Sequence, residues 1–142
     1  MNDIVRTDAA PAPVGAYPHA RRVGNLLFLS GVGPRQPGGN AIAGNVHDAD
    51  GRLTGYDFEA QCHQVFANVR AVLEASGAAW TDLVDVTVFL TDMERDFATY
   101  NRLYADYFAG VDACRTTLGV TSLPTPIAIE LKCVAAIGAS TP

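Results

Sequence analysis

The sequence predicts an α+β fold in which two helices cover one face of a single mixed sheet of five to six strands. Three observations lead to this expectation. The 142 residues suit one domain, spanning 1–142, with a core of its own. The spacing of apolar residues switches between a period of two and a helical period of about 3.6. The elements follow the order strand, strand, helix, strand, helix, strand, strand, which places at least one parallel pair within the sheet.

The N-terminal part of the chain predicts an arm, a hairpin and a loop. Residues 1–18 contain three prolines, so they are expected to form an extended arm. Gly24-Asn25 precedes the apolar run 26–30 and is typical of a tight hairpin turn. Residues 33–55 are rich in Gly, Pro, Asn and Asp, and this composition predicts a long surface loop.

The remaining elements follow from the spacing of apolar residues. From Tyr56 onward these residues recur every three or four positions until Gly77, which predicts a helix that ends at this glycine. A strand, a second helix and two further strands are then expected at 84–90, 97–108, 115–120 and 127–137.

The charge of the chain argues against nucleic acid as a partner. Lys and Arg total 10 against 15 Asp and Glu, a net charge of −5, whereas nucleic-acid binders carry a basic face. A membrane partner is not expected either, because no apolar stretch approaches the roughly 20 residues that cross a bilayer. The first residues lack the pattern of a secretory signal, so we expect a cytoplasmic protein.

Cysteine and histidine spacing gives no sign of a metal site. The three cysteines are odd in number and form no C-x-x-C pair, which argues against a disulfide framework and a thiolate zinc site. The three histidines share no ligand spacing. These residues are Cys62, Cys114 and Cys133, and His19, His47 and His63.

Two charged side chains in the C-terminal third are candidates for catalysis. Glu130 lies in the middle of an otherwise mostly apolar strand, where a glutamate is normally paired, hydrogen-bonded or catalytic. Arg115 opens the preceding strand, and its planar fork suits a bidentate grip on a carboxylate. The alternatives are a solvent-facing or ion-paired glutamate and a surface arginine.

The first hairpin carries further candidates for ligand binding. Ser30 followed by Gly31 ends its second strand and allows backbone N–H groups to approach a ligand closely. The alternative is an ordinary strand terminus. Tyr17 flanks the same hairpin and either lines a site or packs in the core.

Together these residues resemble the reactive-intermediate imine deaminase (Rid/YjgF) family, in the right order over nearly the whole chain. The segments that carry the resemblance are Gly15–Ala20, Gly24–Gly31, Asp85–Leu90, Asp96–Asn101, Arg115, Leu123-Pro124 and Ile129–Leu131. The resemblance implies a chorismate-mutase-like fold and a homotrimer, or a dimer of trimers, with pockets at the subunit interfaces. It also implies hydrolysis of 2-imino or 2-enamino acids to 2-oxo acids and ammonia, without metal or cofactor.

The resemblance assigns roles to individual residues. It implies that Arg115 holds the substrate carboxylate and that Glu130 positions the attacking water. The further positions that line the family's pocket correspond to Tyr17, Ser30, Gly31 and Asn101.

Several departures from the common family pattern resemble the 2-aminomuconate deaminase branch. Thr117 replaces a cysteine, Val32 replaces a glutamine, Pro18-His19 replaces Ser-Gln, and the loop that contains Arg35 is longer. That branch converts the dicarboxylate 2-aminomuconate to 4-oxalocrotonate and ammonia in the catabolism of aromatic compounds. For the second carboxylate we expect an extra cation, with Arg35 as the first candidate and His19 as the second; Thr117 is expected in the pocket.

Two other functions are compatible with the same residues. A broad-specificity 2-iminobutanoate/2-iminopropanoate deaminase would use the same catalytic groups without a second cation. A non-catalytic protein that binds small acids would not need a carboxylate on a buried strand close to an anionic ligand.

Overall fold

One mixed sheet forms the centre of the computed structural model, which describes residues 3–139. Its six strands lie in the order β1 (Ile4–Val5), β2 (Ala20–Val23), β3 (Leu26–Leu29), β8 (Ile129–Ala136), β6 (Leu83–Leu90) and β7 (Cys114–Gly119). All neighbours are antiparallel except β6 and β7, which are joined by a helix and run parallel. The predicted strand–helix–strand unit and mixed sheet are confirmed.

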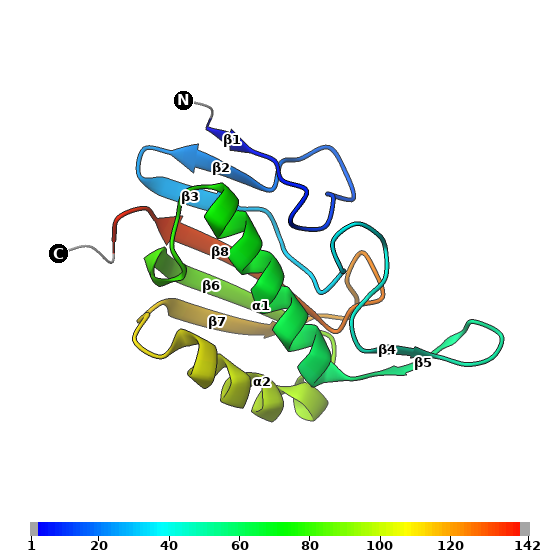
Figure 1. The fold of residues 1–142 in the computed structure, drawn as a ribbon. Helices are drawn as coiled ribbons and strands as arrows, with labels where there is room; N and C mark the ends of the chain where they lie inside the picture. Colours follow the sequence, from blue (N-terminus) through cyan, green and yellow to red (C-terminus); the bar gives the residue numbers. More distant parts are fainter. Residues whose placement is uncertain (1–2, 140–142) are drawn as a thin grey trace.

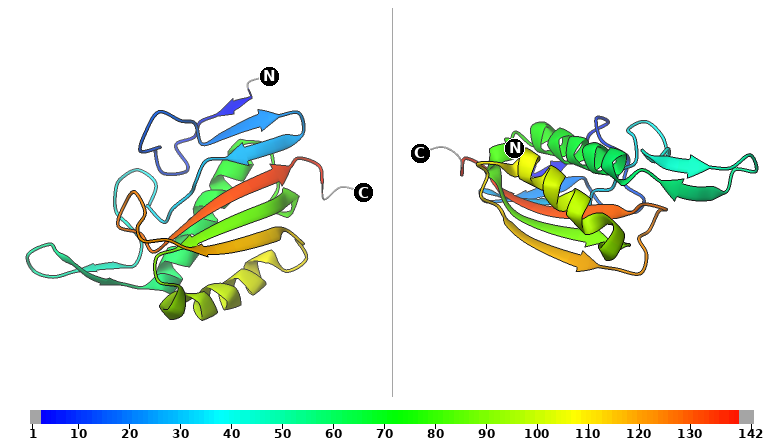
Figure 2. Two further views of the ribbon diagram at one scale, coloured as in Figure 1. Left: turned by 180° about the vertical axis from the view of Figure 1, so that it is seen from behind. Right: turned by 90° about the horizontal axis from the view of Figure 1, so that it is seen from below.

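Both long helices, α1 (Phe58–Ala75) and α2 (Met93–Phe108), cover the same face of this sheet (Figure 1; Figure 2, right). The carboxylate of Asp57 accepts from the backbone N–H of Ala60 and caps the start of α1. Gly77 follows the end of α1 with a φ of +74°, a conformation that favours glycine. The two-layer α+β plan is therefore confirmed.

The second helix begins earlier than the apolar spacing predicts. It starts at Met93 rather than near Phe97, because the carboxylate of Asp92 accepts from the backbone N–H of Arg95 and caps the helix there. The first turn is mostly polar, so apolar periodicity could not reveal it.

The two faces of the sheet differ in what covers them. The side chains of Ile129, Leu131, Cys133 and Ala135 are fully buried beneath the helices. The alternate residues of β8 point to the opposite face, which no helix crosses when the sheet is seen from behind (Figure 2, left). We call this second face the open face.

Two segments that the sequence predicts as arm and loop contain strands. The N-terminal arm includes β1, which pairs with β2 through backbone hydrogen bonds such as His19 N–H to the Val5 carbonyl at 3.0 Å. The predicted loop 33–55 contains a two-stranded hairpin, β4 (Asn45–His47) and β5 (Leu53–Tyr56). These strands are too short and too polar to produce a clear apolar alternation, so composition alone was misleading.

The β4–β5 hairpin projects away from the body of the protein (Figure 1). Its base is fixed by the amide of Asn45, which donates to the Pro126 carbonyl at 2.9 Å and accepts from the buried Gln61 at 2.8 Å. Gln61 in turn accepts from the backbone N–H of Ala128 at 2.8 Å. This chain of polar contacts holds the hairpin base beside the entry to β8.

Across residues 3–139, no helix is both long enough and apolar enough to cross a membrane.

Candidate functional site

Glu130 lies on the open face of the sheet, directly over Gly31. A Cβ atom added to Gly31 would stand 3.1 Å from the Cδ atom of Glu130 and 3.2 Å from its Oε2 atom. Leu131 pairs with Val32, so the chain beyond β3 continues alongside β8 and brings Gly31 to this place. Only a residue without a side chain leaves the carboxylate where it is.

The carboxylate of Glu130 is half-buried and unpaired. Among residues 3–139 it forms neither a hydrogen bond nor an ion pair with a protein group. Burial raises the pKa of Glu130 above its ordinary value, because the charged form loses part of its hydration. A carboxyl group in this state can exchange protons closer to neutral pH than an exposed one.

A small hollow opens beside this carboxylate. Four of the predicted site residues meet around it: Tyr17, Gly31, Arg35 and Glu130. Val14, Gly33, Pro124, Thr125 and Ile127 complete its lining. We refer to the four predicted residues as the glutamate cluster.

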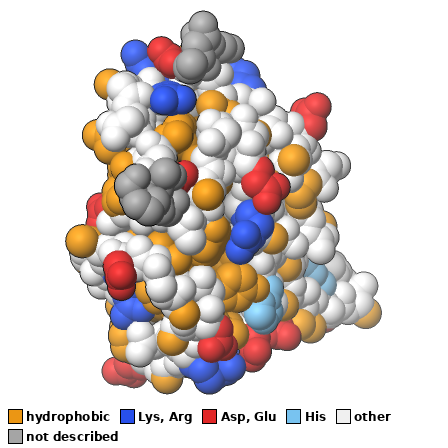
Figure 3. All heavy atoms as spheres, turned by 60° about the vertical axis from the view of Figure 1, so that its left-hand side comes forward, with side chains coloured by type: hydrophobic (Ala, Val, Ile, Leu, Met, Phe, Trp, Pro, Cys, Tyr) orange, Lys and Arg blue, Asp and Glu red, His pale blue; other side chains and the backbone are white. Residues whose placement is uncertain are grey.

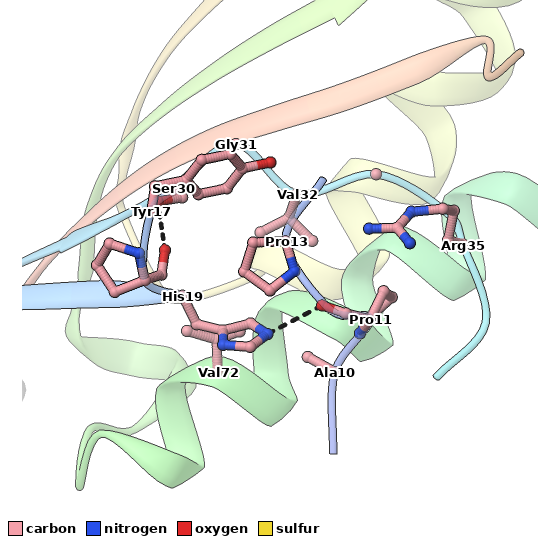
Figure 4. A pocket seen from close by; sticks show the side chains of 12 residues that line it. Ala10, Pro11, Pro13, Tyr17, His19, Ser30, Gly31, Val32, Arg35 and Val72 are labelled. Atoms are coloured by element: carbon pink, nitrogen blue, oxygen red, sulfur yellow. Dashed lines mark hydrogen bonds between the residues drawn. The ribbon is translucent and has the colours of Figure 1, made fainter. Parts of the chain in front are cut away.

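The predicted residues Ser30 and His19 hold the backbone beside this cluster. Ser30 Oγ donates to the Pro18 carbonyl at 2.7 Å, and His19 Nε2 lies 2.9 Å from the Pro11 carbonyl (Figure 4). The second ring nitrogen of His19 accepts from the backbone N–H of Thr7 at 3.3 Å. Both ring nitrogens of His19 are thus engaged with backbone, so the structure gives this histidine a role in holding the N-terminal arm.

Arg35 points along the arm toward Pro13 and Val32 (Figure 4). Its Nη2 atom donates to the Ala12 carbonyl, and within residues 3–139 it has no carboxylate partner. The buried amide of Asn68 on α1 donates to the carbonyls of Gly33 at 2.8 Å and of Arg35 at 2.7 Å. Helix α1 therefore fixes the backbone from which this cation extends.

Arg115 and Thr117 on β7 lie away from the glutamate cluster, on the side where β7 packs against α2. The guanidinium carbon of Arg115 lies 4.7 Å from the ring centre of Tyr104, 5.6 Å from that of Tyr100 and 5.9 Å from that of Phe97. A cation at this distance over aromatic faces is stabilised by their quadrupoles. Asn101 lies one turn from Phe97 on the exposed side of α2.

Three hydroxyl groups near Arg115 have no hydrogen-bond partner among residues 3–139. They are the hydroxyls of Tyr100, Tyr104 and Thr117, and all three are buried. Burial raises the pKa of Tyr104, and the guanidinium of Arg115 opposes that rise. We refer to Arg115 and Thr117, with the three aromatic rings, as the arginine cluster.

Strand register places Arg115 and Glu130 on opposite faces of the sheet. Val86 pairs with Arg115 in β7 and with Cys133 in β8, and paired residues share a face. Cys133 is buried under the helices, so Arg115 also points to the helix side. Glu130 is three positions from Cys133 on the same strand, and because side chains alternate between the two faces, it points to the open face. One subunit therefore does not bring the two predicted catalytic residues together, which corrects any interpretation of them as a pair within one chain.

The sequence predicts the rings beneath Arg115 only as an apolar helix face, and it assigns no role to Asn68. Phe97, Tyr100 and Tyr104 have the spacing of an ordinary core-facing stripe. Their unused hydroxyls and the cation above them become visible only when β7 is placed against α2. Asn68 interrupts the apolar face of α1, which is the one signal that marks it as a buried polar anchor.

No group of three or more His, Cys, Asp or Glu residues in the described part of the chain is arranged to hold a metal ion. Burial also raises the pKa values of Cys62 and Cys133 to about 12, so these thiols are not poised as nucleophiles. The chemistry of the two clusters is that of a carboxyl group, two guanidinium groups and several hydroxyls.

The fold and the two clusters define an α+β protein with an unpaired carboxyl group on one face of its sheet and an arginine stacked on aromatic rings on the other. Residues 7–137 match the family described as Endoribonuclease L-PSP. A RutC family protein of Pyrococcus horikoshii is 36% identical over 136 residues, which are 95% of this chain and 98% of that protein. The chain therefore belongs to the Rid/YjgF (RutC, L-PSP) family.

Two further comparisons support the same assignment. A protein of Dermatophagoides farinae named 2-iminobutanoate/2-iminopropanoate deaminase is 34% identical over 135 residues, covering 94% of this chain and 95% of that protein. The crystal structure of the Escherichia coli YjgF gene product superposes with a TM-score of 0.77 and 32% identity, covering 94% and 97% of the two chains. The predicted YjgF-like, chorismate-mutase-like architecture is confirmed.

Proposed function

We propose that the protein hydrolyses enamines and imines of 2-oxo acids, and that its substrate is the dicarboxylate 2-aminomuconate. The observation that carries the proposal is the unpaired, half-buried carboxylate of Glu130, whose pKa is raised by burial. General acid–base catalysis requires such a group near the reacting atoms. The deaminase names of relatives such as the Dermatophagoides protein support the same reaction class.

The complete site is proposed to form between subunits of a homotrimer. Arg115 and Glu130 lie on opposite faces of the sheet, so a substrate that touches both groups needs the Arg115 of one subunit and the Glu130 of another. The open face also exposes Leu26, Phe28 and Leu118, whose exposed fractions are 38, 39 and 44%. Apolar side chains gathered on one sheet face favour a second subunit as the cover.

The proposed reaction adds water and releases ammonia. The enamine takes a proton at carbon from solvent and becomes an iminium ion, and Glu130 takes a proton from the water that attacks C2. Glu130 then gives that proton to the nitrogen of the resulting carbinolamine and the C–N bond breaks with release of ammonia. The hydroxyl returns a proton to solvent as the carbonyl of the 2-oxo acid forms. Arg115 holds the neighbouring carboxylate, and this orients C2 toward the water.

Arg35 is the observation that favours a dicarboxylate over the substrates of a broad-specificity deaminase. It is a second cation without a carboxylate partner among residues 3–139, and it lines the same hollow as Glu130. A substrate with one carboxylate would leave this cation unused.

Two other functions receive less support. The family description names an endoribonuclease, but this chain has a net charge of −5, and charges of both signs are interspersed on the side shown in Figure 3. A protein that only binds small acids would gain nothing from an unpaired carboxylate beside an anionic ligand, since like charges repel. Cytoplasmic location stays a prediction from the sequence.

The test measures ammonia release by the wild-type protein from two substrates. One is 2-aminomuconate, generated enzymatically in the assay, and the other is 2-iminobutanoate. We expect hydrolysis of both, with the higher kcat/KM for 2-aminomuconate. Equal or higher kcat/KM for 2-iminobutanoate would identify a broad imine deaminase, and release from neither would refute the deaminase proposal.

A further inference from the structure

A second hollow lies beside the one that contains Glu130. It has a volume of about 260 Å³ and lies between the N-terminal arm, the loop before β4 and the turn before β8. Val14, Arg35 and Thr125 line both hollows, so the two cavities share a wall. The segment 40–47, which belongs to the longer loop of this chain, supplies most of the rest of the lining.

The lining of this hollow combines apolar walls with two nitrogen-bearing side chains. Val14, Ile42 and Pro126 supply apolar surface. The imidazole of His47 makes no hydrogen bond to any group within residues 3–139, and Arg35 uses only one of its five N–H donors, toward Ala12. Such a lining suits a hydrocarbon chain that ends in a carboxylate.

We propose that this second hollow is a distal subsite for the far carboxylate of a linear, unsaturated dicarboxylate, held by Arg35 and His47. The proposal rests on the proposed function in one respect: the reacting end of the same molecule lies next to Glu130. It goes further by assigning the other end to a cavity formed by the base of the β4–β5 hairpin and by naming His47 as a ligand-binding residue.

The backbone that carries these two side chains is held by hydrogen bonds within the chain. Arg35 pairs with Ile42 in an isolated antiparallel bridge, and Gln36 N–H donates to the Ala41 carbonyl at 2.8 Å. Asn68 anchors the backbone of Arg35 from below, and Asn45 anchors β4 to Pro126. A loop held by its own hydrogen bonds loses little conformational freedom on binding, so the subsite can contribute its interactions to affinity.

The other nearby histidine does not serve this purpose. Both ring nitrogens of His19 contact backbone groups, those of Thr7 and Pro11. A carboxylate bound to His19 would have to displace one of these contacts. Arg35 and His47 can take a carboxylate without breaking a contact between the arm and the body.

The experiment compares binding of two stable, non-reacting probes by isothermal titration calorimetry. trans,trans-Muconate and sorbate share the same diene chain and differ in the second carboxylate. Because a hydrogen bond to a charged group contributes roughly 10- to 100-fold in affinity, we expect muconate to bind tighter by at least about 10-fold. Equal affinities for the two probes would overturn the subsite.

Variants then test the two named residues. Arg35→Met should reduce muconate binding to the level of sorbate, and Arg35→Lys should keep part of the preference because it retains a charge. His47→Leu should weaken muconate binding by several-fold while sorbate binding changes less. A full preference for muconate in Arg35→Met would overturn the role of Arg35, and an unchanged ratio in His47→Leu would overturn that of His47.

The matched control is Arg52→Met at the turn of the β4–β5 hairpin. It removes the same charge from a neighbouring part of the chain, outside the hollow, and should keep the wild-type preference. A loss equal to that of Arg35→Met would mean that general charge, rather than the subsite, selects muconate. Because neither probe reacts, binding of the probes and release of ammonia from 2-aminomuconate are separate measurements. A preference for muconate together with no ammonia release from 2-aminomuconate would refute the proposed function and leave the subsite standing.

Discussion

The glutamate cluster and the arginine cluster are built in different ways. Glu130 projects from a central strand, but its surroundings are loops and the N-terminal arm, held by backbone contacts from Ser30, Asn68 and His19. Arg115 instead rests on three aromatic rings of α2, packed against an edge strand. The first construction leaves a carboxyl group exchangeable with solvent, and the second fixes the position of a cation.

The difference matches the two tasks of the proposed reaction, which are proton transfer and holding of the substrate carboxylate. A proton-transferring group needs a tuned pKa, which partial burial without a partner provides for Glu130. An anion-holding group needs a fixed direction, which stacking on rings provides for Arg115. Neither Glu130 nor Arg115 has an ion-pair partner within residues 3–139, as expected if the two groups meet a substrate between subunits.

Removing the titrating group of the glutamate cluster should have the largest effect. Glu130→Gln keeps the shape of the side chain but cannot move a proton, so we expect kcat to fall by about 10²–10⁴-fold with KM little changed. The melting temperature at neutral pH should be no lower than that of the wild type, because the substitution removes a half-buried charge that has no partner. A destabilised variant with near-normal kcat per folded molecule would make Glu130 a structural residue.

Weakening the arginine cluster should have the next largest effect. Arg115→Lys keeps the charge but loses the planar fork and its stacking on Tyr104, so we expect KM to rise and kcat to fall, with kcat/KM lower by about 10- to 100-fold. Steady-state kinetics on 2-aminomuconate measure both constants. Arg102→Lys, on the exposed side of α2, is the control and should behave like the wild type. Near-normal kcat/KM in Arg115→Lys would contradict the proposal that Arg115 holds the substrate carboxylate.

Mixing the two variants tests whether the clusters meet between subunits. The two variant chains are mixed and assembled at random. About a quarter of the interfaces then combine a native Arg115 from a Glu130→Gln chain with a native Glu130 from an Arg115→Lys chain. Activity should therefore return toward about a quarter of the wild-type value. Light scattering on the same sample should show a trimer or a multiple of one. If the site lay within one subunit, every site would contain one of the two substitutions, and co-expression would restore no activity. A stable monomer would also contradict the interface site.

A smaller effect is expected from crowding the glutamate cluster. In Gly31→Ala the new Cβ would stand 3.1–3.4 Å from the carboxylate of Glu130, which must shift by a few tenths of an ångström. Because displacement of about 1 Å can cost 10²-fold, we expect a fall in kcat of about 10-fold or less. Gly39→Ala is the matched control, since its Cβ would meet nothing within 4 Å. Equal kcat for the two variants would show that the position of Glu130 is not critical.

The pH dependence should give the smallest change and report on the same carboxyl group. Glu130 must be ionised to take a proton from water, and burial raises its pKa, so kcat/KM should decline as pH falls through a value above that of an exposed glutamate. In the assembled site, the positive charge of a nearby Arg115 would lower the pKa of Glu130 and shift this decline toward lower pH. Rate profiles of the wild type and of the residual activity of Glu130→Gln provide the comparison. The decline of kcat/KM at acidic pH should be absent in the variant. If it persists, another group causes it.

The sequence predicted the helices and central strands well because their apolar periods are strong. The alternation over 127–137 correctly separated Glu130 from the buried positions of β8. Apolar spacing could not reveal β1, which is held by backbone pairing, or the β4–β5 hairpin, which is fixed by amide contacts of Asn45 and Gln61. Backbone and amide partners leave little trace in apolar spacing, so these elements emerge only from the folded chain.

The sequence by itself determined the elements of the fold, the candidate residues and the family that they resemble. Only the tertiary structure decided which of those residues meet. Periodicity tells which side chains share a face within one strand, but the relation between strands depends on register, and register put Arg115 with the helices and Glu130 on the open face. The packing of the N-terminal arm and the longer loop then brought Tyr17, Gly31 and Arg35 to the carboxylate, because long-range contacts rather than local spacing bring separate segments together.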